Sequence, residues 1–100
     1  MTLKQLRQRR DKGITFLDTE LSEWREIVNK DKLDMSDGHN CIAGQVTGME
    51  YDEAIEQFGL SKKEAFEYAF YTGTSWLDYE EKSKFQEDYA KLTKVWTEVL

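Results

Sequence analysis

Apolar side chains recur every three or four residues along most of this chain, the spacing of helices that bury one face. A long stripe lies near the C-terminus, with steps of 4, 3, 4 and 3 residues: Phe85, Tyr89, Leu92, Trp96 and Val99. A second stripe has mostly charged positions between its members: Ile14, Leu17, Leu21, Trp24, Ile27 and Val28. We therefore predict a helix over 14–29, interrupted near Ser22, and a last helix that begins after Asp78.

The first twelve residues have a different character, because Leu3 and Leu6 are their only large apolar side chains apart from Met1. Their composition favours a helix over 2–12 with Thr2 as its N-cap. Gly13 follows and is expected to separate this helix from the next. We thus divide the chain into a basic N-terminal arm or helix, 1–12, and a single helical domain, 13–100.

Between the two stripes, glycines and capping residues predict short helices separated by turns. The chain has six glycines and no proline. Residues 30–40 are expected to form a loop that Leu33 and Met35 hold against the core. Three short helices follow from the local signals: 41–47 with Asn40 as N-cap and Gly48 as its stop, 53–58 between Asp52 and Gly59, and one opened by the capping box of Ser61 and Glu64.

The expected fold is mainly α, a compact bundle of about five helices. Residues 71–78 fit either an extended turn or a short strand. In the second case, a minimal two-stranded element would form between 33–35 and 71–77.

Charge is unevenly distributed along the chain. The net charge is −6, and five basic residues against Asp11 give residues 1–12 a charge of +4, which leaves −10 for residues 13–100. An acidic body repels nucleic-acid backbones and anionic membranes, whereas a basic arm does the opposite locally. No signal-peptide pattern and no run of about 20 apolar residues is present, so we expect a cytoplasmic protein that does not engage membranes.

The one cysteine, Cys41, is the main candidate for chemistry, because His39 lies two residues away and Asp34 and Asp37 are close in sequence. This group supplies half of a zinc site, or a Cys–His nucleophile pair. A structural zinc needs about four ligands, usually several Cys or His, and adjacent loop residues rarely form a nucleophile–base pair. We expect Cys41 to be a buried side chain at a helix start. For the protein as a whole, we expect no catalytic residues, no metal and no cofactor. The presence of only one cysteine in the sequence also fits a reducing compartment.

Two glycines in the segment AGQVTG, Gly44 and Gly48, resemble a phosphate-binding loop only superficially, because the GK[ST] sequence is missing. The better interpretation is close packing, in which Gly44 lets another helix or an aromatic ring approach its backbone. Gln45 is then expected to satisfy a buried backbone group.

Two further groups are candidates for binding. Tyrosines and a tryptophan beside acidic residues have the composition of a protein-interface hot spot, or else roof the core: Tyr68, Tyr71, Trp76 and Tyr79. The basic side chains of the arm suit phosphate contacts, or else they dock the arm on the acidic body: Lys4, Arg7, Arg9 and Arg10. No aromatic residue is interleaved with them for base stacking.

Residues 17–48, 58–70 and 89–100 resemble a group of small proteins found in phages, prophages and actinobacterial genomes. The resemblance covers about two thirds of the chain. It is carried by a Cys-Ile/Val-x-Gly-Gln motif, here Cys41 to Gln45, and by a closing Leu-Thr-x-x-Trp helix, here Leu92 to Trp96. This chain departs from the group at Ala69, where glycine is usual, and in its basic arm. The resemblance implies an accessory gene of a phage or mobile element and no particular activity.

The expected function is therefore interaction with another protein, without catalysis. The partner would be a host protein, such as a defence or nucleic-acid enzyme that the chain inhibits, and the protein itself a monomer or a homodimer. The alternative is a nucleic-acid-associated protein that uses its basic arm. An enzyme centred on Cys41 and His39 ranks third.

Overall fold

The computed structural model describes the backbone of residues 2–71 and 82–100, and the side chains of 2–71 and 86–100. These residues form α1 (Leu3–Glu20), α2 (Trp24–Ile27), the 3-10 helix η1 (Lys30–Lys32), α3 (Ile42–Thr47), α4 (Tyr51–Gln57), α5 (Lys62–Glu67) and α6 (Lys82–Thr97). The prediction of a mainly helical bundle is confirmed. No strand occurs in these ranges, so 33–35 is not a strand, and the pairing expected with 72–77 lies outside the described residues.

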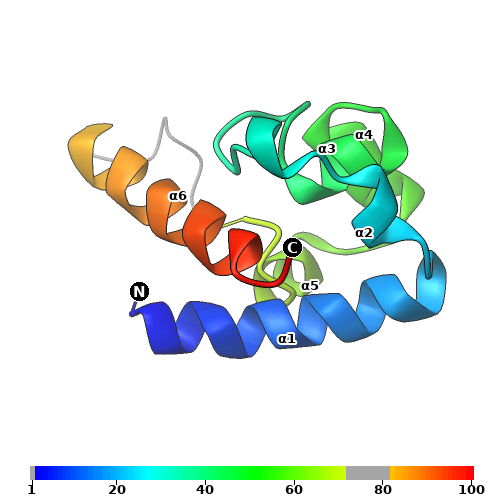
Figure 1. The fold of residues 1–100 in the computed structure, drawn as a ribbon, viewed down its shortest axis with the longest axis horizontal. Coiled ribbons are helices and arrows are strands. Elements are labelled where there is room, and N and C mark those ends of the chain that lie inside the picture. The colour runs from blue at the N-terminus through cyan, green and yellow to red at the C-terminus, as the bar shows by residue number, and fades with distance from the viewer. Residues whose placement is uncertain (1, 72–81) are drawn as a thin grey trace.

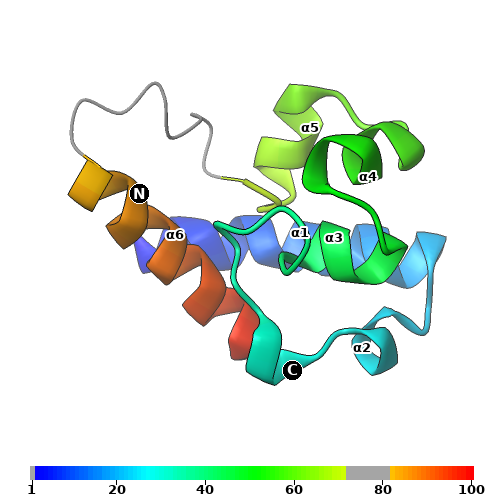
Figure 2. The same ribbon diagram turned by 90° about the horizontal axis from the view of Figure 1, so that it is seen from above.

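Helix α1 forms one long side of the molecule, and α6 crosses over its N-terminal half (Figure 1). Helices α3 and α4 pack against each other and lie above the C-terminal half of α1 in Figure 1. Helix α5 packs against α1 (Figures 1 and 2). The C-terminal end of α6 therefore lies over α1, within reach of the basic N-terminal residues. No helix in the described part of the chain is long and apolar enough to cross a membrane.

The N-terminal arm is part of α1, which continues through Gly13 without a break. Thr2 caps this helix as predicted, in a capping box with Gln5. The predicted stop at Gly13 is wrong. A Cβ there would overlap the carbonyl oxygen of Tyr68 and lie 3.0 Å from the Trp96 ring. Glycine at this position permits close packing and does not end the helix.

The predicted interruption near Ser22 is confirmed, because α1 ends at Glu20 and α2 begins at Trp24. The break also changes which side chains face the core. Trp24 and Val28 are buried, whereas Ile27, assigned to the same stripe, is 44% exposed. Helical spacing does not hold to the end of this group, because α2 ends at Ile27 and Val28, its C-cap, has an extended backbone. Helix α2 also runs in a different direction from α1 (Figure 2).

The stops of the short helices agree with the sequence signals, and two of the starts do not. Gly48 and Gly59 have φ values of 73° and 71°, the left-handed conformation expected of glycine at a helix end. Ser61 forms the predicted capping box with Glu64. Helix α4 begins at Tyr51, two residues before the expected position.

Helix α3 is capped by Cys41 and not by Asn40, because the Cys41 Sγ accepts from the backbone N–H of Gly44 at 3.3 Å. The Asn40 side chain instead donates to the Asp37 carboxylate. Gln45 bonds to backbone groups as predicted, although these groups are exposed or part-buried and not fully buried. Its Oε1 accepts from the Asn29 N–H at 2.6 Å, and its Nε2 donates to the Asn40 carbonyl at 3.0 Å.

The core is built around two tryptophans from distant parts of the chain. The Trp24 and Trp96 rings meet edge to face at 5.9 Å, and Phe70 stacks on Trp96 at 5.9 Å with an interplanar angle of 9°. Leu33 and Met35 are buried and hold the loop before α3 against this core, as expected. The last stripe also behaves as predicted at Tyr89, Leu92 and Trp96, which are buried, while the Phe85 side chain lies outside the described set.

Candidate functional site

A pocket of about 550 Å³ lies where the loop before α3, helix α4, the segment after α5 and helix α6 meet. It is lined by Met35, Ser36, Gly38, Cys41, Tyr51, Asp52, Ile55, Lys62, Phe70, Tyr71 and Tyr89. Its volume is in the range of cavities that enclose small ligands. Four of these eleven lining residues are aromatic, and the Tyr51 and Tyr71 ring centroids are 6.0 Å apart at 53°.

Short-range hydrogen bonds shape the loop on one side of this pocket. The Asp34 carboxylate accepts from the backbone N–H and the hydroxyl of Ser36, and the Asp37 carboxylate accepts from the His39 N–H at 2.9 Å. The Gly38 carbonyl packs so tightly on Gly44 that a Cβ at Gly44 would overlap it. The predicted close approach to Gly44 is confirmed, but the predicted helix or aromatic ring is wrong, because the backbone of Gly38 and His39 in the loop approaches it.

Two tyrosines of the pocket, Tyr51 and Tyr71, are neutral phenols. Burial raises the pKa of Tyr51 far above its ordinary value, and the nearby Tyr71 and Tyr89 raise it further. Burial, with Tyr89 as the second cause, also raises the pKa of Tyr71. A buried phenolate would lose hydration, so the hydroxyls of Tyr51 and Tyr71 stay protonated.

The segment that forms one side of the pocket is acidic, and its acidic residues are called the acidic rim below; of these, Asp52 lines the pocket. Residues 34–61, which supply the loop, α3 and α4, contain six acidic residues and no lysine or arginine. All six are exposed: Asp34, Asp37, Glu50, Asp52, Glu53 and Glu56. The hydrogen bond from the His39 N–H, followed by that from the Asn40 side chain, lowers the pKa of Asp37 and keeps it ionised. Among the described lining residues, Lys62 is the only cation.

Cys41 and His39 do not form an activated pair. The Cys41 side chain is buried, and burial raises its pKa to about 11. The His39 imidazole is exposed, with Nε2 3.6 Å from Glu50 Oε1. Within residues 2–71 and 86–100, no three His, Cys, Asp or Glu side chains are placed to hold a metal ion. The thiol therefore lacks the charge environment of a nucleophile.

Of the four aromatic candidates, the structure describes Tyr68 and Tyr71, which line different surfaces. Tyr68 stacks on Phe16 at 5.2 Å and also contacts Phe70, so it roofs the core beside α1. It lines a separate groove along α1. Tyr71 belongs to the pocket. Trp76 and Tyr79 lie outside the described residues.

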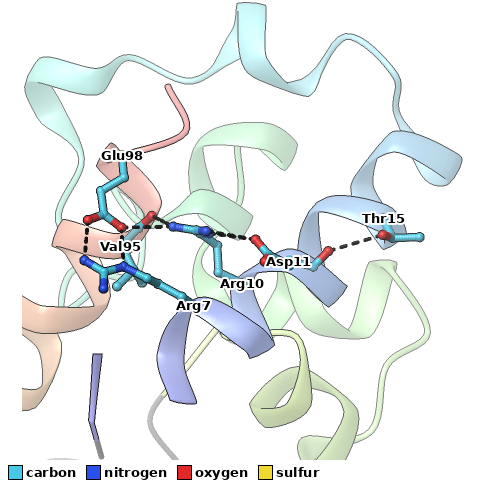
Figure 3. Close-up of polar contacts among 6 residues, drawn as sticks. All are labelled: Arg7, Arg10, Asp11, Thr15, Val95 and Glu98. Atoms are coloured by element: carbon cyan, nitrogen blue, oxygen red, sulfur yellow. Dashed lines mark hydrogen bonds and ion pairs between the residues drawn. The ribbon is translucent and has the colours of Figure 1, made fainter. Parts of the chain in front are cut away.

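The arginines of the basic arm contact the body of the protein. Arg7 makes a bidentate pair with Glu98, at 3.0 Å from Nε and 2.7 Å from Nη2 (Figure 3). Arg10 donates to the Val95 carbonyl and to Glu98, and only 11% of its side chain is exposed. The Arg9 guanidinium lies 3.7 Å from the centroid of the Phe66 ring. Of the candidates, Lys4 remains exposed.

These contacts change the electrostatics at the end of α6. The hydrogen bond from Arg7 lowers the pKa of Glu98, and the charges of both arginines add to this effect. The arm therefore docks on the acidic body, the second of the two roles considered for it. The arginines of the arm, Arg7, Arg9 and Arg10, therefore already have partners within the protein.

Sequence reasoning missed Tyr51, Asp52 and Tyr89 as members of a site. Tyr89 was assigned to the core stripe, and it is indeed buried while lining the pocket. The one signal available in the sequence was the absence of lysine and arginine from residues 34–61. That signal marks an acidic surface and cannot show that a pocket opens beside it.

In comparisons with known proteins, no family model, no curated protein and no solved structure matches this chain.

Proposed function

We propose that this chain acts by binding another protein, without catalysing a reaction, and that the pocket and its acidic rim form the binding face. The observation that carries the proposal is a tyrosine-lined pocket of about 550 Å³ beside a stretch that holds six acidic residues and no lysine or arginine. Tyrosines in partly buried positions are enriched at the centres of protein interfaces. Acidic residues around them favour encounter with a basic surface.

The resemblance to small phage and prophage proteins supports a more specific role. We propose an accessory protein of a phage or mobile element that works in the host cytoplasm on a host protein. A defence enzyme or another enzyme that acts on nucleic acid is the favoured partner, because its basic groove is complementary to the acidic rim. Inhibition would follow if the chain occupied that groove, as a monomer or as a homodimer.

The experiment compares the natural chain with two double variants that carry the same change in net charge. Asp52→Lys with Glu53→Lys reverses the rim beside the pocket. Glu20→Lys with Glu23→Lys reverses exposed acids at the far end of α1 and the following turn. Each protein is tagged and used to capture proteins from host extract, and captured proteins are identified by mass spectrometry. We expect a partner that the rim variant loses and the control variant retains.

Two outcomes would contradict the proposal. One is a partner that both double variants bind equally well. The other is a mobility shift of DNA or RNA at low salt that Lys4→Glu with Lys12→Glu abolishes, because these exposed lysines lie on the arm and outside the rim. The second outcome would favour the nucleic-acid alternative, with an affinity that falls steeply as salt rises.

A further inference from the structure

We propose that the pocket receives one uncharged aromatic side chain, a phenylalanine or a tryptophan, projected from the partner protein. This inference rests on the proposed function and names the chemical group that enters the pocket. Two observations carry it. Two groups of contacting aromatic rings each supply part of the pocket wall, and the charges of the described lining residues sum to zero.

The first group of rings reaches the pocket through Phe70, which is buried and lines it. The Phe70 ring stacks on Trp96 at 5.9 Å and on Phe58 at 6.2 Å. It also meets the Phe16 ring edge to face at 6.1 Å. This part of the wall is therefore an aromatic ring that other rings hold in place from behind.

The second group reaches the pocket through Tyr51 and Tyr71, whose ring centroids are 6.0 Å apart. The Tyr71 ring also meets the Phe66 ring at 6.1 Å and 71°. Rings with centroids about 4.5–7 Å apart attract each other beyond the effect of the area they bury. A ring that enters the pocket can extend both groups at once, which an aliphatic side chain cannot do. Met35 and Cys41 add sulfur atoms to the lining, and the thioether of methionine also favours contact with aromatic rings.

The lining favours an occupant without charge. Asp52 and Lys62 are the charged side chains among the described lining residues, and their signs are opposite. Tyr51 and Tyr71 keep their protons, because burial raises the pKa of both. A charged group that entered the pocket would give up hydration and meet a lining with no net charge to compensate it. An uncharged ring has no such cost.

The acidic rim and the pocket then recognise two features of one partner surface. Grooves that bind single-stranded nucleic acid combine basic side chains with aromatic rings on which the bases stack. Such a groove presents a cationic surface to the acidic rim and an uncharged ring to the pocket. Interface hot spots have this arrangement, with an aromatic anchor in a pocket and polar side chains around it. The occupant is therefore a base-stacking ring of the partner, which the chain withdraws from nucleic acid.

The test is an NMR titration of the ¹⁵N-labelled full chain with three capped amino acids. N-acetyl-phenylalanine amide is the probe, N-acetyl-cyclohexylalanine amide is its saturated counterpart, and N-acetyl-arginine amide is the cationic control. We expect phenylalanine to shift the amides of Gly38, Tyr51 and Tyr71, with an affinity about threefold higher than that of cyclohexylalanine. Tyr71→Leu should reduce the phenylalanine affinity several-fold. Tyr68→Leu, the same change in the groove along α1, should leave it unchanged.

Cyclohexylalanine binding as tightly as phenylalanine would overturn the inference and assign the pocket to an aliphatic side chain. Arginine binding as tightly as phenylalanine would overturn it too, and so would the absence of shifts at millimolar phenylalanine. Amide shifts that depend on protein concentration without any probe would assign the pocket to a second copy of the chain. Probe binding that appears only in a Trp76→Ala variant would assign it to the chain's own tryptophan.

The proposed function is tested separately by the capture experiment. If phenylalanine fails to bind but the Asp52→Lys, Glu53→Lys variant still loses the captured partner, the binding face stands and only its occupant is wrong. If phenylalanine binds but both double variants capture the same proteins, the pocket takes an aromatic group and the acidic rim does not select a partner.

Discussion

The indole Nε1 of Trp96 donates a 2.8 Å hydrogen bond to the carbonyl oxygen of Ala69, a residue with a φ of 62°. This bond ties α6 to the turn that follows α5. Phe70 and Tyr71 come directly after that turn and enter the core and the pocket respectively. The bond therefore helps to place the pocket wall, although neither partner lines the pocket.

Replacing Trp96 by phenylalanine should lower the free energy of unfolding by about 2–3 kcal/mol. The change leaves the buried Ala69 carbonyl without its donor and also removes ring area from the core. Urea denaturation followed by circular dichroism measures the loss. Trp24→Phe is the matched control, because its indole donates to the exposed Asp18 carboxylate, which water can solvate. An equal loss of stability in both variants would show that the hydrogen bond to the Ala69 carbonyl contributes no stability beyond that of the buried ring.

Ala69 is a non-glycine residue in the left-handed region and is fully buried. Ala69→Gly should change the free energy of unfolding by less than about 1 kcal/mol, because relief of backbone strain offsets the lost methyl group and the added chain entropy. Ala69→Val should destabilise by about 3 kcal/mol or more, because a β-branched side chain is disfavoured at this φ and has no space. Thermal denaturation of both variants checks the order. Valine tolerated as well as glycine would contradict the φ assigned to this residue.

Gly13→Ala should destabilise the protein by about 1–3 kcal/mol, although alanine is the better helix former by about 1 kcal/mol in an exposed helix. The added Cβ would overlap the Tyr68 carbonyl and press on the Trp96 ring. Gln8→Ala, at an exposed position of the same helix, is the control and should be nearly neutral. Urea denaturation compares the two. A gain in stability for Gly13→Ala would mean that α1 does not pack this closely against α6 and against the turn after α5.

Docking of the N-terminal arm should depend on pH through Glu98. Its pKa is lowered in the folded protein, so the stabilisation is present above the ordinary pKa of a glutamate and is lost as the pH falls through the lowered value. Glu98→Gln should therefore be less stable than the natural chain at pH 7 and equally stable in strong acid. Denaturant midpoints across this range measure the difference. Glu87→Gln, which removes a carboxylate 3.4 Å from Lys91 on the exposed side of α6, is the control and should show a smaller change. A difference for Glu98→Gln that persists in strong acid would exclude ionisation as its cause.

The Cys41 thiol should resist alkylation in the folded protein. It is buried, and its pKa is raised to about 11, so thiolate is scarce at neutral pH. We expect its reaction with a thiol reagent at pH 8 to be far slower than that of the unfolded chain in urea, and to accelerate at the denaturation midpoint. Fast reaction without denaturant would restore the enzyme hypothesis built on Cys41 and His39.

Local signals predicted much of the fold correctly. Thr2, Gly48, Gly59 and the Ser61 capping box mark helix ends as expected, because each satisfies backbone groups within a few residues in sequence. The break near Ser22 followed from similar reasoning. Errors arose where a side chain had two possible partners, as at Asn40, which bonds to Asp37 and leaves the cap to Cys41.

The candidate site was less predictable. The role of Gly13 depends on Tyr68 and Trp96, which are more than fifty residues away. Tyr51, Tyr71 and Tyr89 are also far apart in sequence, and no local signal indicated that they line one pocket. The basic arm illustrates the same limit. Its charge was evident, but only the pairing of Arg7 and Arg10 with Glu98 shows that the arm docks on the body.

The order of the residues alone was enough to specify four features of this protein: the helical class, most helix ends, the buried stripes and the acidic character of residues 34–61. It could do so because propensity, capping and charge act between near neighbours. Packing alone decided that α1 runs unbroken through Gly13, that Ile27 faces outward and that three tyrosines enclose a pocket. These features depend on which distant side chains compete for the same space, and that competition is resolved only when the whole chain has folded.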